Sequence, residues 1–194
     1  MSDGRETDPM TVTSETVGGQ AHGTAIPLRL KPREVEIHAD RRLVFQYLTA
    51  FGRGEAGDDA TSRVVQDDGA RKLVEFRTEI RDLIGRRRMV VTTEWVSETE
   101  PESIDFEAIS GPLDILRDRL ELEEHGGCTV LRYHSTIGVR GWIFGWVVAA
   151  LVIRPIAERH TRRHLLEIKE ATEARARRSK LYPQQPCDRQ VAPA

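Results

Sequence analysis

The chain has 194 residues, of which 31% are charged and 6% aromatic, and its formal net charge is −2 at pH 7. This length suits one domain with tails, and a chain without basic excess or zinc-finger spacing is not expected to bind nucleic acid. The two cysteines, Cys128 and Cys187, lie far apart and form no disulfide framework, and the acidic N-terminus has no signal-peptide pattern. A reducing, cytoplasmic location is therefore expected.

Two tails are predicted to flank a single domain of residues 33–179. Residues 1–32 are rich in Gly, Thr, Ser, Asp and Glu and have no hydrophobic period, so they predict a disordered N-terminal tail. Residues 180–194 carry three prolines and predict a disordered C-terminal tail.

The domain opens with a strand that runs into a helix. In residues 33–39, Val35 and Ile37 fall on one face, which is typical of a half-buried strand. Asp40 then stands where a helix N-cap is expected. The predicted helix carries one apolar stripe, which is formed by Leu43, Val44, Tyr47, Leu48 and Phe51.

Six more strands and one long helix complete the predicted elements. The strands are expected at residues 61–66, 71–80, 86–98, 102–110, 113–124 and 128–139. Short turns join them without crossover helices, which indicates an antiparallel meander. A segment rich in Ala, Arg, Glu and Leu predicts a helix over about 155–178. One long helix that covers the inner face of a seven-stranded sheet makes an α+β fold.

Three stretches carry a family resemblance. They are EVEIHADRRLVFQYL, the hairpin IDFEAISGPLDILRDRLELEEHGGCTVLRYHSTIGV, and IRPIAERHTRRHLLEIKEATEAR in the closing helix. Over roughly residues 33–178 the chain resembles the START-like, or helix-grip (SRPBCC), superfamily, in its polyketide cyclase/dehydrase and coenzyme-Q-binding branch. The resemblance implies a curved antiparallel sheet wrapped around the C-terminal helix, with a deep cavity that holds a lipid, quinone or polyketide.

Alternation along the strands assigns the side chains that face the helix. The inner face is expected to be mostly apolar, with Asp118, Tyr133 and Ser135 as polar exceptions that either bind a ligand or satisfy neighbouring backbone groups. The predicted ligand-binding residues are Phe76, Trp95, Phe106, Leu116, Leu120, Tyr133, Ser135, Ile137, Trp142, Trp146, Ile153, Ile156, His160 and His164.

The register of residues 86–98 has two solutions. Either Trp95 and Thr93 face inward, or Glu94 does together with Thr92 and Val96. In the second solution, loss of solvent around Glu94 raises its pKa and makes it a candidate acid or base.

Residues 141–155 form the one strongly apolar run. Thirteen uncharged residues separate Arg140 from Arg154, and as a helix they span about 20 Å, whereas a bilayer core is ~30 Å thick. The run is therefore expected to pack on the sheet as core or as cavity wall, with Trp142 and Trp146 near the mouth. Peripheral membrane contact is the alternative, with Arg86, Arg87 and Arg88 meeting anionic lipid.

No metal or cofactor site is expected. His160 and His164 are four residues apart, a spacing that can bind zinc, but no third ligand is evident nearby. The two histidines are expected to line the polar end of the cavity instead. The sequence also has no phosphate-binding glycine loop and no dinucleotide fingerprint.

The main functional hypothesis is a cytoplasmic protein that binds or carries a hydrophobic small molecule. The alternative is an enzyme of the cyclase or dehydrase type, in which Glu94, Tyr133, Ser135 or His160 positions or protonates carbonyl groups. The third hypothesis is a membrane-surface or protein-interaction module that uses the tryptophans as an exposed patch. The oligomeric state is left open.

Overall fold

One curved antiparallel sheet forms the body of the molecule in a computed structural model that describes residues 25–52, 60–82 and 84–179. The strand order is β1-β8-β7-β6-β5-β4-β3, and β2 pairs with β8 as β1 does. The strands are β1 (Leu28–Arg29), β2 (Arg33–Ile37), β3 (Ala60–Asp67), β4 (Arg71–Arg81), β5 (Arg87–Thr99), β6 (Ser103–Ser110), β7 (Ile115–His125) and β8 (Cys128–Gly138).

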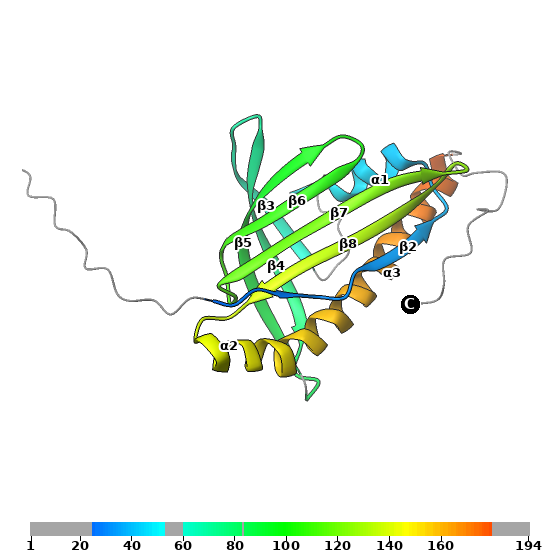
Figure 1. The fold of residues 1–194 in the computed structure, drawn as a ribbon. Helices are drawn as coiled ribbons and strands as arrows, with labels where there is room; N and C mark the ends of the chain where they lie inside the picture. Colours follow the sequence, from blue (N-terminus) through cyan, green and yellow to red (C-terminus); the bar gives the residue numbers. More distant parts are fainter. Residues whose placement is uncertain (1–24, 53–59, 83, 180–194) are drawn as a thin grey trace, which may run out of the picture.

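Helices α1 (Arg41–Leu48) and α3 (Arg154–Ser179) lie on one face of this sheet. Helix α2 (Trp142–Val148) and the π-helical turn η1 (Ala149–Ile153) lead into α3 at the lower end of the molecule (Figure 1). Helix α3 crosses behind β7 and β8, and its C-terminal end lies beside α1 (Figure 1). The predicted α+β architecture, a sheet closed by one long C-terminal helix, is confirmed.

The sheet has one strand more than the sequence predicted. Leu28 and Arg29 pair with Ile137 and Thr136 of β8, and the amide of Leu30 donates a 2.9 Å hydrogen bond to the Ser135 carbonyl. These residues fall inside the segment 1–32 that composition assigned to a tail. A two-residue strand has no alternating pattern by which a sequence could reveal it.

Helix α1 begins as the sequence predicts. The Asp40 carboxylate accepts hydrogen bonds from the amides of Arg42 at 2.9 Å and Leu43 at 3.3 Å. These amides have no partner inside the helix, so the cap satisfies them. Leu43 and Val44 of the predicted stripe are buried against the sheet.

The β3–β4 hairpin turns at Asp68 and Gly69, between the strands predicted at residues 61–66 and 71–80. Gly69 has a φ of 84°, a conformation that favours glycine, and its amide donates to the Asp67 carboxylate at 2.9 Å. The β7–β8 turn uses Gly126 and Gly127 in the same way, with φ values of 58° and 81°. Both turns fix the register of the strands that they join.

Only the C-terminal half of α3 is tightly packed. Its buried residues are Leu165, Ile168, Thr172 and Ala176. Polar contacts hold this half against β2, because the Glu173 carboxylate accepts from the His38 amide at 3.0 Å and Lys169 Nζ donates to the Glu36 carbonyl at 2.5 Å. In the N-terminal half, residues 154–164, no residue is fully buried.

The apolar run of residues 141–155 does not pack as the sequence predicted. Among the residues of α2 and η1 whose side chains are described, only Gly145 and Ala149 are buried, and a Cβ at Gly145 would collide with the carbonyl oxygens of Val139 and Arg140. The helix therefore packs through its smallest residues and turns the large ones outward. The resulting apolar face of α2 and η1 consists of Ile143, Phe144, Trp146, Val147, Val148, Leu151 and Val152.

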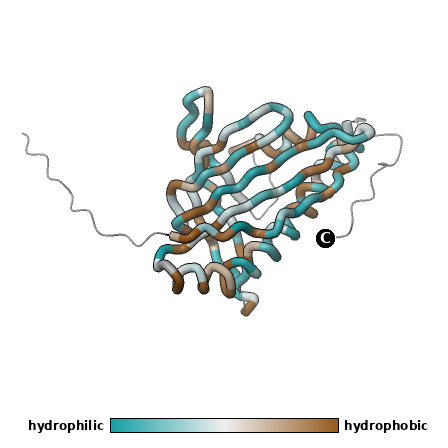
Figure 2. Tube along the Cα trace, viewed as in Figure 1, coloured by the Kyte–Doolittle hydropathy of each residue, from teal (hydrophilic) through white to brown (hydrophobic). Residues whose placement is uncertain are grey.

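The expectation that this run forms core or cavity wall is thus wrong for these seven residues. Phe144 is 83% exposed and Leu151 is 71% exposed. Hydrophobic residues follow one another along this stretch of the chain trace (Figure 2). The side chain of Trp142 lies outside the described residues.

Two further expectations can be compared with the structure. Within the described ranges, every helix is too short or too polar to cross a bilayer. Cys128 is fully buried at the start of β8 and is disulfide-bonded, so the expectation that it is reduced is not met.

Replacement of the Asp40 cap is expected to weaken α1 and the core that it covers. Asp40→Ala should lower the free energy of unfolding by about 1 kcal/mol, because two amides at the start of the helix lose their acceptor. Urea denaturation followed by circular dichroism measures the change. Gln46→Ala, an exposed position in the middle of the same helix, is the control and should change stability little. An equal loss in both variants would contradict the role of the cap.

Candidate ligand-binding site

A polar cluster interrupts the apolar inner face of the sheet. Register places Asp118 of β7 opposite Ser135 of β8 and Phe106 of β6, and it places Glu94 of β5 opposite Ala108 of β6. Tyr133 is the next inward residue along β8 from Ser135. The polar groups therefore converge from three strands on the side of the sheet that α3 covers.

Glu94 is buried and has an altered acidity. Only 7% of the residue is exposed, and Thr92 Oγ1 donates a 2.6 Å hydrogen bond to its Oε1 atom. Burial raises the pKa of Glu94 to about 7. The hydrogen bond from Thr92 opposes this rise, while the nearby charge of Asp118 adds to it.

Asp118 is also held in a setting that disfavours its charge. Burial raises the pKa of its carboxyl group, and interactions with the hydroxyls of Ser135 and Tyr133 partly offset the rise. Its Oδ1 atom is buried and has no hydrogen-bond partner in the described part of the chain. Burial, together with the charge of Asp118, raises the pKa of Tyr133 well above its ordinary value.

Helix α3 completes the cluster from the other side. Thr161 interacts with the Tyr133 hydroxyl, so the sheet and the helix meet at this point. His160 and His164 lie on the same helix with stacked rings 6.0 Å apart. Burial and the charge of Arg163 lower the pKa of His164, which favours its neutral form at pH 7.

The cluster is not fully covered by the helix. Tyr133 and Asp118 are half-buried, and no residue of α3 between 154 and 164 is fully buried. The side chain of His164 is 53% exposed and its Nδ1 atom lies 3.8 Å from Glu167.

Three phenylalanines pack together beside the polar cluster. Phe51, which follows α1, Phe76 of β4 and Phe106 of β6 pack edge to face, with ring centroids 5.8 to 6.4 Å apart. Edge-to-face contact is a favoured arrangement of aromatic rings. The interior thus has an aromatic wall next to the Glu94 and Asp118 carboxyl groups.

Most of the predicted ligand-binding residues fall on the inner face. The sheet residues that do so are Phe76, Phe106, Leu116, Leu120, Tyr133, Ser135 and Ile137. On the helices, Ile153, Ile156 and His160 are partly buried, whereas Trp146 is 41% exposed on the apolar face of α2 and η1. The sequence analysis did not predict Thr161 as a site residue, because it assigned the inner side of α3 by an apolar stripe that includes His160 and His164.

Trp95 lies on the opposite side of the sheet, which settles the register of β5. Thr92, Glu94 and Val96 are the buried residues, so Glu94 faces inward and the expectation that Trp95 faces the helix is wrong. The guanidinium of Arg71 lies 4.0 Å from the centre of the Trp95 ring. This cation–π contact covers an aromatic side chain that would otherwise face water.

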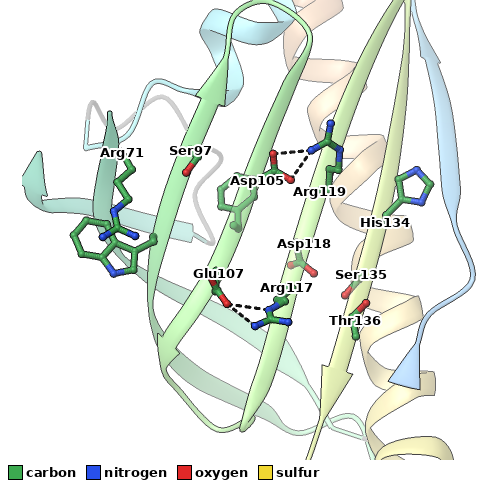
Figure 3. A pocket seen from close by; sticks show the side chains of 12 residues that line it. Arg71, Ser97, Asp105, Glu107, Arg117, Asp118, Arg119, His134, Ser135 and Thr136 are labelled. Carbon is green, nitrogen blue, oxygen red and sulfur yellow. Dashed lines mark hydrogen bonds and ion pairs between the residues drawn. The ribbon is translucent and has the colours of Figure 1, made fainter. Parts of the chain in front are cut away.

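The outer face around Trp95 is charged. Arg119 pairs with Asp105 at 2.8 Å, and Arg117 pairs with Glu107 at 2.7 Å (Figure 3). A shallow depression of about 480 Å³ lies among these side chains, and α3 is on the far side of the sheet in this view. Paired surface charges of this kind are typical of a solvated face.

Comparison of this chain with solved structures identifies its architecture. TTHA0849 from Thermus thermophilus is similar with a TM-score of 0.62 at 16% identity, over 77% of this chain and 99% of that one. A START superfamily protein from Mycobacterium smegmatis is similar with a TM-score of 0.56 at 16% identity, over 78% and 99% of the two chains. The chain has the helix-grip fold.

The helix-grip likeness extends to an enzyme. The Zhui aromatase/cyclase from Streptomyces sp. R1128 is similar with a TM-score of 0.58 at 14% identity, over 80% of this chain and 96% of that one. No protein-family model matches the sequence, and no curated protein matches it. At these identities the likeness shows the fold, and the residues of the site must carry any argument about function.

The acidity of Glu94 gives a testable pH dependence. Folding raises its pKa from 4.5 to about 7, so the folded protein holds a proton that the unfolded chain releases between these values. This contribution to stability is complete at low pH and is lost as the pH rises from 4.5 to about 7. In Glu94→Gln that loss, up to about 3 kcal/mol, should disappear.

Urea denaturation at pH 5, 6, 7 and 8 measures the effect. Glu107→Gln, on the outer face of the neighbouring strand, is the control and should follow the wild-type pH profile. If Glu94→Gln also follows that profile, the burial of a protonated Glu94 is not correct.

Proposed function

We propose that the protein binds, and serves to carry, a hydrophobic small molecule such as a lipid, a quinone or a polyketide between the sheet and α3. The observation that supports this most directly is the loose packing of α3 over residues 154–164, where no residue is fully buried, beside the polar cluster of the inner face. The aromatic wall of Phe51, Phe76 and Phe106 would hold the apolar body of the ligand.

The proposed ligand-contacting set follows from the inner face. It retains the inward sheet residues, adds Phe51, Glu94 and Asp118, and omits Trp95. It also includes Ile153 of η1 and, from the loosely packed half of α3, Ile156, His160 and His164. A cyclase or dehydrase activity is compatible with the same cluster, because Glu94 with a pKa of about 7 could exchange a proton near neutral pH.

Filling the interior should abolish binding. Ala108 lies on the inner face opposite Glu94, and its neighbour Ile109 points outward and is 58% exposed. Ala108→Phe should therefore weaken the binding of the neutral apolar dye Nile red by at least about tenfold, whereas Ile109→Phe should leave it unchanged. Fluorescence titration measures both, and native mass spectrometry of the purified protein identifies a retained ligand. Equal dye binding by the two variants would place the dye elsewhere and count against the proposal.

A second candidate function rests on the apolar face of α2 and η1. Seven large apolar residues are exposed within ten positions of a chain that is otherwise rich in charge. The β4–β5 turn, which carries the exposed Ile84 beside Arg86, Arg87 and Arg88, reaches the same lower edge of the molecule in Figure 1. We propose that this end of the molecule contacts an anionic membrane surface, from which an apolar ligand would be taken.

Sedimentation with vesicles tests the membrane contact. Vesicles that contain phosphatidylglycerol should retain the protein, and Phe144→Asp with Leu151→Asp should reduce the bound fraction several-fold, since each charge must enter an apolar boundary. Leu166→Asp is the control, because Leu166 is 47% exposed on α3 outside this face. If retention is equal for all variants, or if the apolar face instead causes dimerisation without lipid, the membrane role is wrong.

A further inference from the structure

Two carboxyl groups face the proposed ligand space without a basic side chain beside them in the described residues. Burial, Thr92 and Asp118 act on Glu94, while burial, Ser135 and Tyr133 act on Asp118. All the groups that act on either carboxyl are thus hydroxyls or the other acid. An acid pair of this kind cannot ionise fully without a counter-charge.

Most charged groups on the surrounding elements lie in ion pairs of their own. On the same sheet face, Lys72 of β4 pairs with Glu98 of β5 at 2.6 Å. At the β2 edge Arg33, the cross-strand neighbour of Tyr133, lies 3.9 Å from Glu158 of α3, and its Nε atom is buried without a hydrogen-bond partner among the described residues.

The charged residues of α3 also pair along the helix. Arg154 pairs with Glu158 at 2.8 Å and Arg163 with Glu167 at 3.1 Å, while Glu167 lies 3.8 Å from His164. None of these groups is among those that act on the Glu94 or Asp118 carboxyl group.

Asp118 also has an unused acceptor. Its Oδ1 atom is buried without a hydrogen-bond partner among the described residues. Buried acceptors are nearly always satisfied, so a donor carried by a bound ligand would complete the contacts of this oxygen.

We propose that the ligand carries a protonated amine, which is bound by the Glu94 and Asp118 carboxyl groups while its apolar body lies against the three phenylalanines. This rests on the proposed function and specifies its ligand class as an amphipathic amine. A cation lets both acids ionise together and supplies several donors to Oδ1 and its neighbours. A fatty acid would add a third acid to the same interior and is disfavoured there.

Three ligands of equal chain length test this preference. Dodecylamine, dodecanol and dodecanoic acid would be titrated against the intact protein by calorimetry, below their micellar concentrations. At pH 8 dodecylamine should bind about tenfold or more tightly than dodecanol, and dodecanoic acid should bind most weakly. The affinity for dodecylamine should rise from pH 6 to pH 8, as Glu94 ionises, whereas that for dodecanol should not.

Isosteric variants locate the effect. Asp118→Asn and Glu94→Gln should each remove most of the preference for the amine and keep the affinity for dodecanol. Glu107→Gln, on the outer face, should keep the wild-type preference. If a variant does not fold, the pH profile of the wild-type protein still tests the proposal.

The outcomes separate this inference from the function on which it rests. Binding of dodecanol as tight as that of dodecylamine in the wild-type protein, or amine binding that is independent of pH, overturns the amine preference and leaves the hydrophobic-ligand function standing. Failure of all three ligands and of Nile red to bind overturns the ligand-binding function, and the amine preference falls with it.

Discussion

Only one half of α3 packs tightly against the sheet, and the arrangement of the inner face depends on this. Thr172 and Ala176 are small and fully buried, so the C-terminal half of the helix lies close to β2 and α1. The contacts from Lys169 and Glu173 to the β2 region fix that half in place. The N-terminal half has no fully buried residue, so the helix lies more loosely over the sheet there, and this is where we propose that a ligand binds.

The inner face of the sheet is unusual because it carries two carboxyl groups near the proposed ligand-binding region. A protein interior disfavours unpaired carboxyl groups, and two of them on the inner face of one sheet both have a raised pKa. A purely structural core would be more stable with apolar residues at these positions. The presence of both Glu94 and Asp118 on this face is what the proposed amine ligand would account for.

Much of the fold could be predicted from local patterns. Alternation on β6, β7 and β8 gave the correct inner face, and Asp40 and the glycine turns gave correct element boundaries. On β5, alternation alone could not decide whether Glu94 or Trp95 faces the helix. The first solution places the carboxyl group of Glu94 inside, and the second places the apolar Val96 outside. The choice depends on Arg71, a residue of another strand that covers the Trp95 ring, and no local pattern contains that information.

The apolar run failed as a prediction for a different reason. Its hydrophobicity indicated burial, but burial also requires a surface on which large side chains fit. Gly145 and Ala149 occupy the contact with the rest of the chain, and a larger residue at Gly145 would strike the backbone at Val139 and Arg140. Helix α2 consequently cannot rotate to hide Phe144 without losing that contact. The outward display of apolar side chains is therefore a fixed property of the folded state, and this face can meet an apolar surface without any change of conformation.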